Sequence, residues 1–215
     1  MWRGPTGRMC SPGPTRSISR RYARFAAAKS GTPESDGVLE LLRPDLYVAS
    51  LEDVDLDALA ARGIKGLLID RDKTLTAWRS REVSAARREW VAAARERFAL
   101  CVVSNTIFYR GVRAVGDSLG VPVVVRWGLG RKPFPGAFRA GLARIGVAPN
   151  EAAMIGDQLL TDIAGAKLQG LFTVLVEPVQ GREFPGTELI RPLERMLLRR
   201  WGLHPQGRSD GDQRP

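Results

Sequence analysis

Short apolar runs alternate with longer helical patterns between residues 39 and 200, and this alternation restricts the chain to a small set of folds. Apolar residues at helical spacing predict a short helix that includes Tyr47 and ends at Gly63, and longer helices over 82–97, 107–119, 134–145, from about 161, and 187–200. The apolar runs predict five strands, at 64–69, 99–103, 121–125, 152–155 and 172–176. Because these strands are apolar on both faces, they predict an α/β fold with a parallel sheet and helices on both faces.

The length and composition favour one folded domain. The 215 residues, of which 44% are hydrophobic, suffice for a single well-buried core. We expect this domain over residues 39–201, between a disordered basic leader (1–38) and a disordered tail (202–215). No apolar run approaches the roughly 20 residues that a membrane-spanning helix needs. Cys101 lies in an apolar run and is expected to be a buried, reduced thiol.

The positive charge is concentrated at the ends of the chain, and residues 1–36 contribute +5 of the formal +10. This leader is rich in Arg, Ser, Gly and Pro, as organellar transit peptides are. Two localisations therefore stay open: the bacterial cytoplasm, with peripheral attachment to the membrane, and the mitochondrial matrix or another organelle. The basic ends are expected to be solvated or attracted to anionic lipid, and nucleic acid is the less favoured partner.

Polar clusters follow three of the expected strands at their carboxyl ends. The clusters are Asp70–Thr74, Ser104 with Asn105, and Asp157 with Asp162. A further cation, Lys132, precedes the helix expected at 134–145. In open α/β sheets the ligand site lies outside the carboxyl ends of the strands, so these side chains are expected to converge there.

The residue types in these clusters suit phosphoryl transfer. Asp70 and Asp72, two residues apart after a strand, can divide the work of nucleophile and proton donor. A third carboxylate from another strand completes an oxygen-rich site that favours Mg²⁺, since the sequence has no Cys/His set for zinc. Ser104 and Lys132 would hold the phosphoryl oxygens as negative charge develops on them.

These clusters, in this order, resemble the motifs of the haloacid dehalogenase (HAD) hydrolases. Motif I is matched by Asp70-x-Asp72-x-Thr74, motif II by Ser104, motif III by Lys132 and motif IV by Gly156-Asp157-x4-Asp162. The resemblance implies that Asp70 is the nucleophile and a metal ligand, and that Asp72 is the general acid/base, whose backbone carbonyl also binds metal. The other implied roles are phosphate binding (Ser104, Asn105, Lys132), metal binding (Asp157) and support (Thr74, Asp162).

Several stretches narrow the resemblance to the YqeG-type group of subfamily IIIA, whose eukaryotic relatives are phosphatidylglycerophosphate phosphatases. These stretches are Arg43-Pro44 with Tyr47-Val48, Val103-Ser-Asn105, Arg131-Lys-Pro133 and Ile155-Gly-Asp-Gln-Leu-Leu-Thr-Asp162. The sequence departs from the group at Lys73, where Asn is usual, and at Arg71, where bacterial members have an apolar residue. The Lys73 side chain is expected to point outward, and assistance in phosphate binding is the alternative.

The resemblance implies a HAD-like, Rossmann-type sheet. The spacing adds that no cap domain is present, because 31 residues from Asp72 to Ser104 leave room for little more than one helix and one strand. The leading functional hypothesis is a Mg²⁺-dependent phosphomonoesterase with an aspartyl-phosphate intermediate, which converts phosphatidylglycerophosphate to phosphatidylglycerol. Two alternatives stay open: a phosphatase of a small soluble sugar or nucleotide phosphate, and a non-catalytic protein that binds phosphate or nucleic acid.

Overall fold

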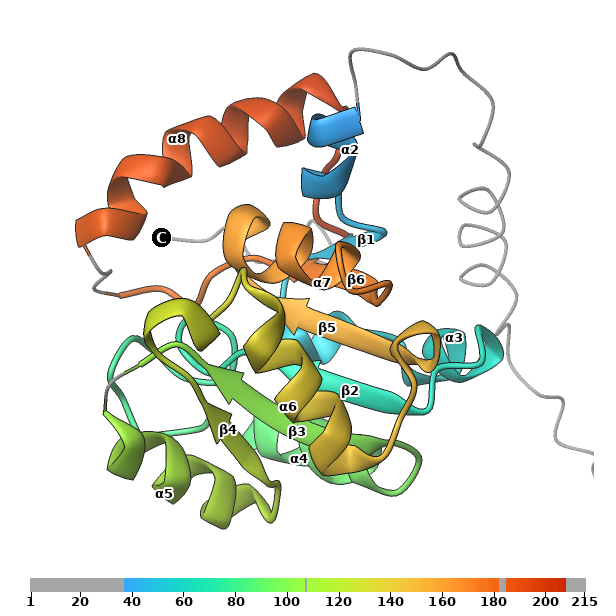
Figure 1. Ribbon diagram of the computed structural model, residues 1–215, viewed down its shortest axis with the longest axis vertical. Helices are drawn as coiled ribbons and strands as arrows, with labels where there is room; N and C mark the ends of the chain where they lie inside the picture. The colour runs from blue at the N-terminus through green and yellow to red at the C-terminus, as the bar shows by residue number, and fades with distance from the viewer. Residues whose placement is uncertain (1–36, 107, 182–184, 208–215) are drawn as a thin grey trace, which may run out of the picture. The chain divides into compact units, whose positions relative to one another are not determined.

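Six parallel strands form one sheet in the computed structural model, which describes residues 37–106, 108–181 and 185–207. The strand order across the sheet is β1-β6-β5-β2-β3-β4 (Figure 1). The strands are β1 (Leu46–Val48), β2 (Gly66–Ile69), β3 (Ala99–Ser104), β4 (Val123–Val125), β5 (Ala152–Gly156) and β6 (Phe172–Val176). The five strands that the sequence predicts are all present, and the prediction of a parallel α/β sheet is confirmed.

Helices connect the strands and cover both faces of the sheet. The longer ones are α4 (Ala85–Arg95), α5 (Tyr109–Leu119), α6 (Pro135–Ile145) and α8 (Pro185–Arg200). Shorter helical segments are α2 (Gly37–Leu42), η2 (Leu51–Asp53), α3 (Leu56–Ala61), η3 (Gly128–Gly130), η4 (Pro149–Glu151), the π-helix η5 (Leu159–Ala164) and α7 (Gly165–Lys167). Local sequence sets the helix ends: the Ser84 hydroxyl accepts a hydrogen bond from the Arg87 amide at the start of α4, and Gly146 ends α6 in the left-handed conformation.

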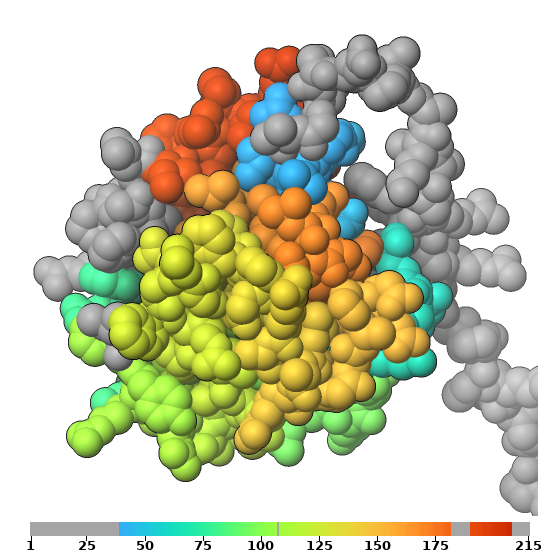
Figure 2. All heavy atoms as spheres, in the orientation of Figure 1, coloured from blue at the N-terminus to red at the C-terminus, as the bar shows by residue number. Residues whose placement is uncertain are grey.

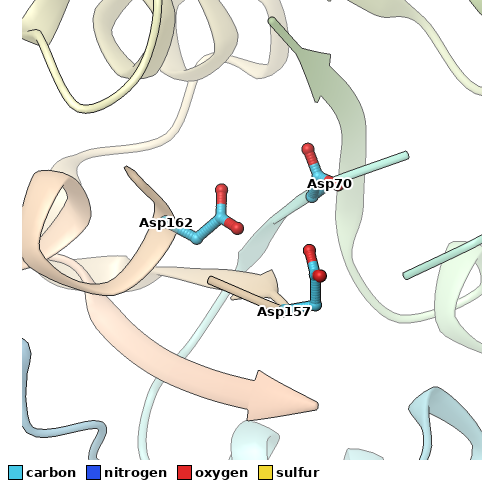
Figure 3. Close-up of side chains that lie close together, drawn as sticks. All are labelled: Asp70, Asp157 and Asp162. Carbon is cyan, nitrogen blue, oxygen red and sulfur yellow. The ribbon is translucent and has the colours of Figure 1, made fainter. Parts of the chain in front are cut away.

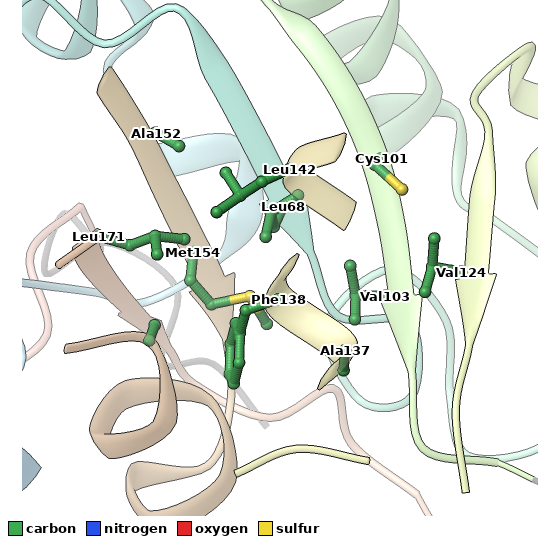
Figure 4. Close-up of a cluster of buried hydrophobic side chains, with 11 residues drawn as sticks. Leu68, Cys101, Val103, Val124, Ala137, Phe138, Leu142, Ala152, Met154 and Leu171 are labelled. Carbon is green, nitrogen blue, oxygen red and sulfur yellow. The ribbon is translucent and has the colours of Figure 1, made fainter. Parts of the chain in front are cut away.

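One apolar cluster lies between the sheet and helix α6 (Figure 4). Phe138 and Leu142 of α6 pack there with Leu68 of β2 and Met154 of β5. Helix α4 packs against β3 and buries Trp90, whose indole N–H donates to the Val54 carbonyl at 3.0 Å. Cys101 belongs to the α6 cluster and is a free, buried thiol, as expected.

The order of the strands places β2 between β3 and β5. The chain proceeds from β2 through β3 to β4 on one side and then returns to form β5 on the other side of β2. This reversal is a topological switch point, where the loops after neighbouring strands diverge and leave room for a ligand. The segments that follow β2 and β5 therefore meet at one place on the carboxyl edge.

Two features differ from the expectations at the edge of the sheet. Tyr47 lies in the short strand β1, which pairs with β6, and not in a helix. Gln206 lies in the segment expected to be a disordered tail, yet its amide donates to the Tyr47 carbonyl at 3.0 Å and its carbonyl accepts from the Ala49 amide at 2.8 Å. Both hydrogen bonds join backbone groups of Gln206 to the chain at the three-residue strand β1. The ordered domain therefore extends past residue 201.

The connections leave no inserted domain between the strands that carry the polar clusters. Helix α4 alone lies between β2 and β3, and α5 alone lies between β3 and β4, so the expected absence of a cap domain is confirmed. Among the described residues, no helix combines the length and the apolar character that crossing a bilayer requires. The leader at 1–36 and the last eight residues lie outside the described part of the chain.

Candidate active site

Three buried carboxylates from three segments point toward one another at the switch point (Figure 3). Asp70 follows β2, Asp157 follows β5 and Asp162 lies in the π-helix η5. One ligand oxygen from each lies within 4.8 Å of the other two. The prediction that the side chains of motifs I and IV lie close together is therefore confirmed. A π-helix such as η5 is often found at functional sites.

Gly156 lets the motif IV loop approach this closely. A Cβ atom at position 156 would lie only 2.5 Å from the Asp162 Cγ atom, far inside van der Waals contact. The Asp162 carboxylate in turn accepts a hydrogen bond from the Gln158 amide at 3.2 Å, which fixes it at the start of the π-helix. The Gly-Asp-x4-Asp spacing thus follows from packing, because only glycine leaves space for the second carboxylate.

Lys132 provides a buried cation for two of the three carboxylates. Its Nζ atom lies 2.5 Å from Asp70 Oδ1 and 2.7 Å from Asp162 Oδ1, and it also donates to the Val103 carbonyl at 3.1 Å. These carboxylates raise the pKa of Lys132 against the opposing effect of burial, so the ammonium stays charged. The Lys132 main chain is held by Asn105, whose Oδ1 accepts from the Lys132 amide at 2.8 Å and whose Nδ2 donates to the Lys132 carbonyl at 2.9 Å.

A second buried cation, Arg191 of helix α8, approaches the third carboxylate, and sequence reasoning missed it. Its Nη2 atom forms an ion pair with Asp157 Oδ2, and its Nη1 atom donates to the Asp157 carbonyl at 2.6 Å. Glu194, one turn further along α8, lies 3.3 Å from Arg191 Nη1 and accepts from the Leu159 amide at 2.7 Å. Helix α8 is therefore part of the site.

The charges of this cluster do not cancel. Among the described residues, four buried carboxylates (Asp70, Asp157, Asp162, Glu194) face two buried cations (Lys132, Arg191), which leaves two negative charges when all four carboxylates are ionised. Burial is the main cause that raises the pKa of Asp70 well above its usual value, and it raises the pKa of Asp157 to about 7 despite the Arg191 guanidinium. The charged form of the cluster is thus incompletely compensated by the protein.

A divalent cation fits this cluster. Asp157 Oδ1 is buried and has no hydrogen-bond partner within the described residues, although a buried carboxylate oxygen without a partner is costly. It belongs to the group of three carboxylates that could hold a metal ion. Oxygen donors of this kind suit Mg²⁺, and one such ion would balance the two uncompensated charges.

Comparison with known proteins places the chain in a family. A family model described as HAD-hydrolase-like matches residues 129–181. A probable phosphatase YqeG of Bacillus subtilis is 31% identical over 156 residues, covering 72% of this chain and 88% of that protein. This chain belongs to the YqeG-type HAD phosphatases. It is therefore a phosphoric monoester hydrolase of the HAD superfamily, as the motifs indicated.

Two plastid-associated relatives carry a more specific name. A chloroplastic phosphatidylglycerophosphate phosphatase 1 of Chlamydomonas reinhardtii is 31% identical over 187 residues, which cover 80% of this chain and 68% of that protein. A chloroplastic/mitochondrial phosphatidylglycerophosphate phosphatase 1 of Arabidopsis thaliana is 29% identical over 180 residues, 79% of this chain and 52% of that protein. The chain thus spans about half the length of the Arabidopsis relative.

The remaining motif I residues lie beside the cluster. Asp72 is partly exposed, and its Oδ1 atom accepts from Arg71 Nη2 at 2.7 Å and from the Arg79 amide at 3.0 Å. Arg71, where bacterial YqeG-type proteins were expected to carry an apolar residue, is buried and forms this ion pair. The Thr74 hydroxyl is buried without a hydrogen-bond partner in the described part of the chain. Its supporting role remains a prediction.

Lys73 and Ser104, one in motif I and one in motif II, are both buried. The Lys73 side chain does not point outward: it is buried, and its Nζ atom donates to the Gly181 carbonyl at 2.9 Å. The segment after β6 causes this burial, because it crosses the motif I loop and bonds the Val179 amide to the Lys73 carbonyl at 2.8 Å. Ser104 is buried, and its hydroxyl accepts from the Thr106 amide at 3.3 Å.

Proposed function

We propose that this phosphatase hydrolyses phosphatidylglycerophosphate to phosphatidylglycerol through an aspartyl-phosphate on Asp70, with Mg²⁺ as its cofactor. The observation that carries the chemical part is the juxtaposition of Asp70, Asp157 and Lys132 at the switch point of the sheet. A buried carboxylate, an orphaned metal-ligand oxygen and a charged lysine are the groups that phosphoryl transfer to a protein carboxylate requires.

The reaction has two steps. In the first, an Asp70 carboxylate oxygen forms a bond to phosphorus while the bond between phosphorus and the ester oxygen breaks. Asp72, in its protonated form, gives its proton to the departing alkoxide. In the second step, Asp72 accepts a proton from water, the water oxygen attacks phosphorus, and the Asp70 carboxylate and inorganic phosphate are released.

The other residues of the site hold the phosphoryl group and the metal. Lys132 and Ser104 supply donors for the phosphoryl oxygens, whose charge grows during transfer. Both ends of the Asn105 amide bond to the Lys132 backbone, so we assign Asn105 to positioning Lys132. Asp70, Asp157 and the Asp72 carbonyl would hold Mg²⁺, with Asp162 in support. The ion would reduce the repulsion between the nucleophile and the phosphate.

The substrate proposal is supported by the relatives and by the open site. Both of the algal and plant relatives are named phosphatidylglycerophosphate phosphatases. Among the described residues, single helices connect β2 to β3 and β3 to β4, so no inserted domain covers the site there. A phosphate carried on a lipid headgroup can approach a site without a cap domain at a membrane surface, whereas a cap domain would restrict its access.

The test combines phosphate release with trapping of the intermediate. Purified protein is given phosphatidylglycerophosphate, a sugar phosphate and a nucleoside monophosphate, each with Mg²⁺ or EDTA. We expect lipid-phosphate release that requires Mg²⁺, and preference for either soluble ester would reject the lipid assignment. With ³²P-labelled substrate, Asp70→Asn should carry no label, because the amide is a poor nucleophile.

A matched control accompanies the trapping experiment. Asp117→Asn changes an exposed aspartate of helix α5 away from the cluster and should be labelled as wild type is. Asp72→Asn should turn over slowly, because it lacks the proton donor and acceptor. Wild-type turnover by Asp70→Asn would mean that the aspartyl-phosphate mechanism is wrong.

A further inference from the structure

The most exposed large apolar residues in the described part of the chain are Trp127 and Leu129, which are 75% and 85% exposed. Both lie at the short 3₁₀ turn η3, one just before it and one within it. Isolated exposed apolar residues are common, but a tryptophan and a leucine together at the tip of one turn are not needed for packing. We call residues 126–131 the Trp127 turn.

The Trp127 turn lies beside the active site. It follows strand β4 at the carboxyl edge of the sheet and leads directly into Lys132, whose ammonium contacts Asp70. In Figure 2 the olive part of the chain, to which the turn belongs, lies at the visible surface. Phe108, after β3, and Phe134, at the start of α6, add half-exposed rings on the same edge.

The charged residues of the turn itself have one sign. Arg126 and Arg131 flank the apolar pair, both are exposed, and neither forms an ion pair with any described residue. Between residues 105 and 139 the sequence contains a single acidic residue, Asp117. Asp117 lies near the end of α5, toward the opposite edge of the sheet, and is paired with Arg113.

We propose that the Trp127 turn docks the enzyme onto the surface of an anionic phospholipid bilayer. Tryptophan prefers the bilayer interface, and exposed arginines without acidic neighbours are attracted to anionic headgroups. The turn has two exposed apolar side chains between two exposed arginines, an arrangement that suits insertion between headgroups. This inference rests on the lipid substrate of the proposed function and adds the surface that would present that substrate to Lys132 and Asp70.

Vesicle binding without any phosphorylated substrate tests the proposal. Full-length protein is sedimented with phosphatidylcholine vesicles that contain or lack phosphatidylglycerol, at low and physiological salt. The wild-type protein should bind only the vesicles that contain phosphatidylglycerol. Trp127→Ser/Leu129→Ser should bind them at least about tenfold more weakly, as expected for two apolar side chains that no longer leave water. Arg126→Gln/Arg131→Gln should lose about fivefold per residue at low salt.

Leu168→Ser is the matched control. Leu168 is also exposed, at 61%, but it follows α7 and precedes β6, at the amino edge of the sheet. It should bind as wild type does. All of these proteins carry the basic leader, so its contribution cancels. Equal vesicle binding by the double serine variant and wild type would overturn the proposal. A change from dimer to monomer in light scattering, without a change in vesicle binding, would make the turn a self-association surface and would also overturn it.

A second measurement reports the location of the tryptophan itself. Trp127 is one of five tryptophans, so the relevant quantity is the part of the quenching by phospholipids brominated on the acyl chains that Trp127→Phe removes. Equal quenching of wild type and Trp127→Phe would reject insertion of the turn. Hydrolysis of p-nitrophenyl phosphate should be unchanged in the serine variant, so loss of docking is separable from loss of the catalytic chemistry.

Discussion

Replacement of Arg191 by methionine tests whether helix α8 supports the active site electrostatically. Methionine keeps much of the apolar stem but removes the guanidinium that pairs with Asp157 and Glu194. The loss leaves the Asp157 carbonyl without its hydrogen bond from Arg191. A buried polar group without its partner costs about 1–3 kcal/mol, which sets the pH-independent part of the destabilisation.

The rest of the effect depends on pH. Burial, the larger effect, raises the pKa of Asp157 to about 7. The Arg191 guanidinium opposes this increase. Without Arg191 this pKa rises further, so above pH 7 the folded variant retains a proton that the wild type releases. Above pH 7 the wild type therefore gains stability relative to the variant as pH increases, at up to about 1.4 kcal/mol per pH unit until the pH passes the raised pKa of the variant.

Urea unfolding in EDTA at pH 6, 7, 8 and 9 measures this difference. The control is Arg195→Met, which removes an exposed arginine from the same helix, and it should cost no more than about 0.5 kcal/mol at every pH. Glu194 also loses its partner, and because burial raises its pKa, it changes the difference in the same direction. A difference between Arg191→Met and wild type that is flat from pH 6 to pH 9 would refute the electrostatic reasoning.

Two further predictions concern motif IV. Asp157→Asn should raise the half-saturating Mg²⁺ concentration for turnover on the order of 100-fold or more, because even the loss of a residue that only supports a ligand can weaken metal binding by that factor. Overlapping metal titrations for the variant and the wild type would reject Asp157 as a ligand. Gly156→Ala should lower the unfolding free energy by about 1–3 kcal/mol, because its Cβ atom would lie 2.5 Å from Asp162 Cγ. Gly130→Ala, whose Cβ would have 3.6 Å to its nearest neighbour, is the control in the same urea titration, and equal effects would contradict the packing argument.

The sequence was sufficient to predict the strands that carry the chemistry. β2, β3 and β5 are continuous apolar runs buried on both faces, a pattern that few other elements share. Asp70 and Asp157 could be placed because each follows such a strand directly. β1 was missed because three residues carry no periodicity, and its pairing with β6 and Gln206 uses backbone groups that have no sequence signature.

The sequence contains a pattern that could have identified Arg191 as a buried residue. Arg191, Glu194 and Leu198 lie three and then four residues apart, so the two charged residues share the helix face that buries Leu198. In a solvent-exposed helix, an arginine and a glutamate three residues apart form an ordinary surface ion pair. Arg191 and Glu194 are easily interpreted as such a pair from the sequence. Charged residues on the apolar stripe of a helix are the feature that distinguishes the two cases.

Arg191 shows why the four motifs alone do not define this site. Lys132 of motif III and Arg191 each neutralise a motif carboxylate, but Arg191 comes from the last helix, outside the motifs. Their positions depend on packing between distant segments: Asn105 holds the Lys132 backbone, and apolar contacts of Leu197 and Leu198 with η5 and β6 hold α8. The acidic cluster is therefore stable in the folded protein only when the sheet edge and helix α8 are both assembled, and this requirement couples the metal site to the fold of the whole domain.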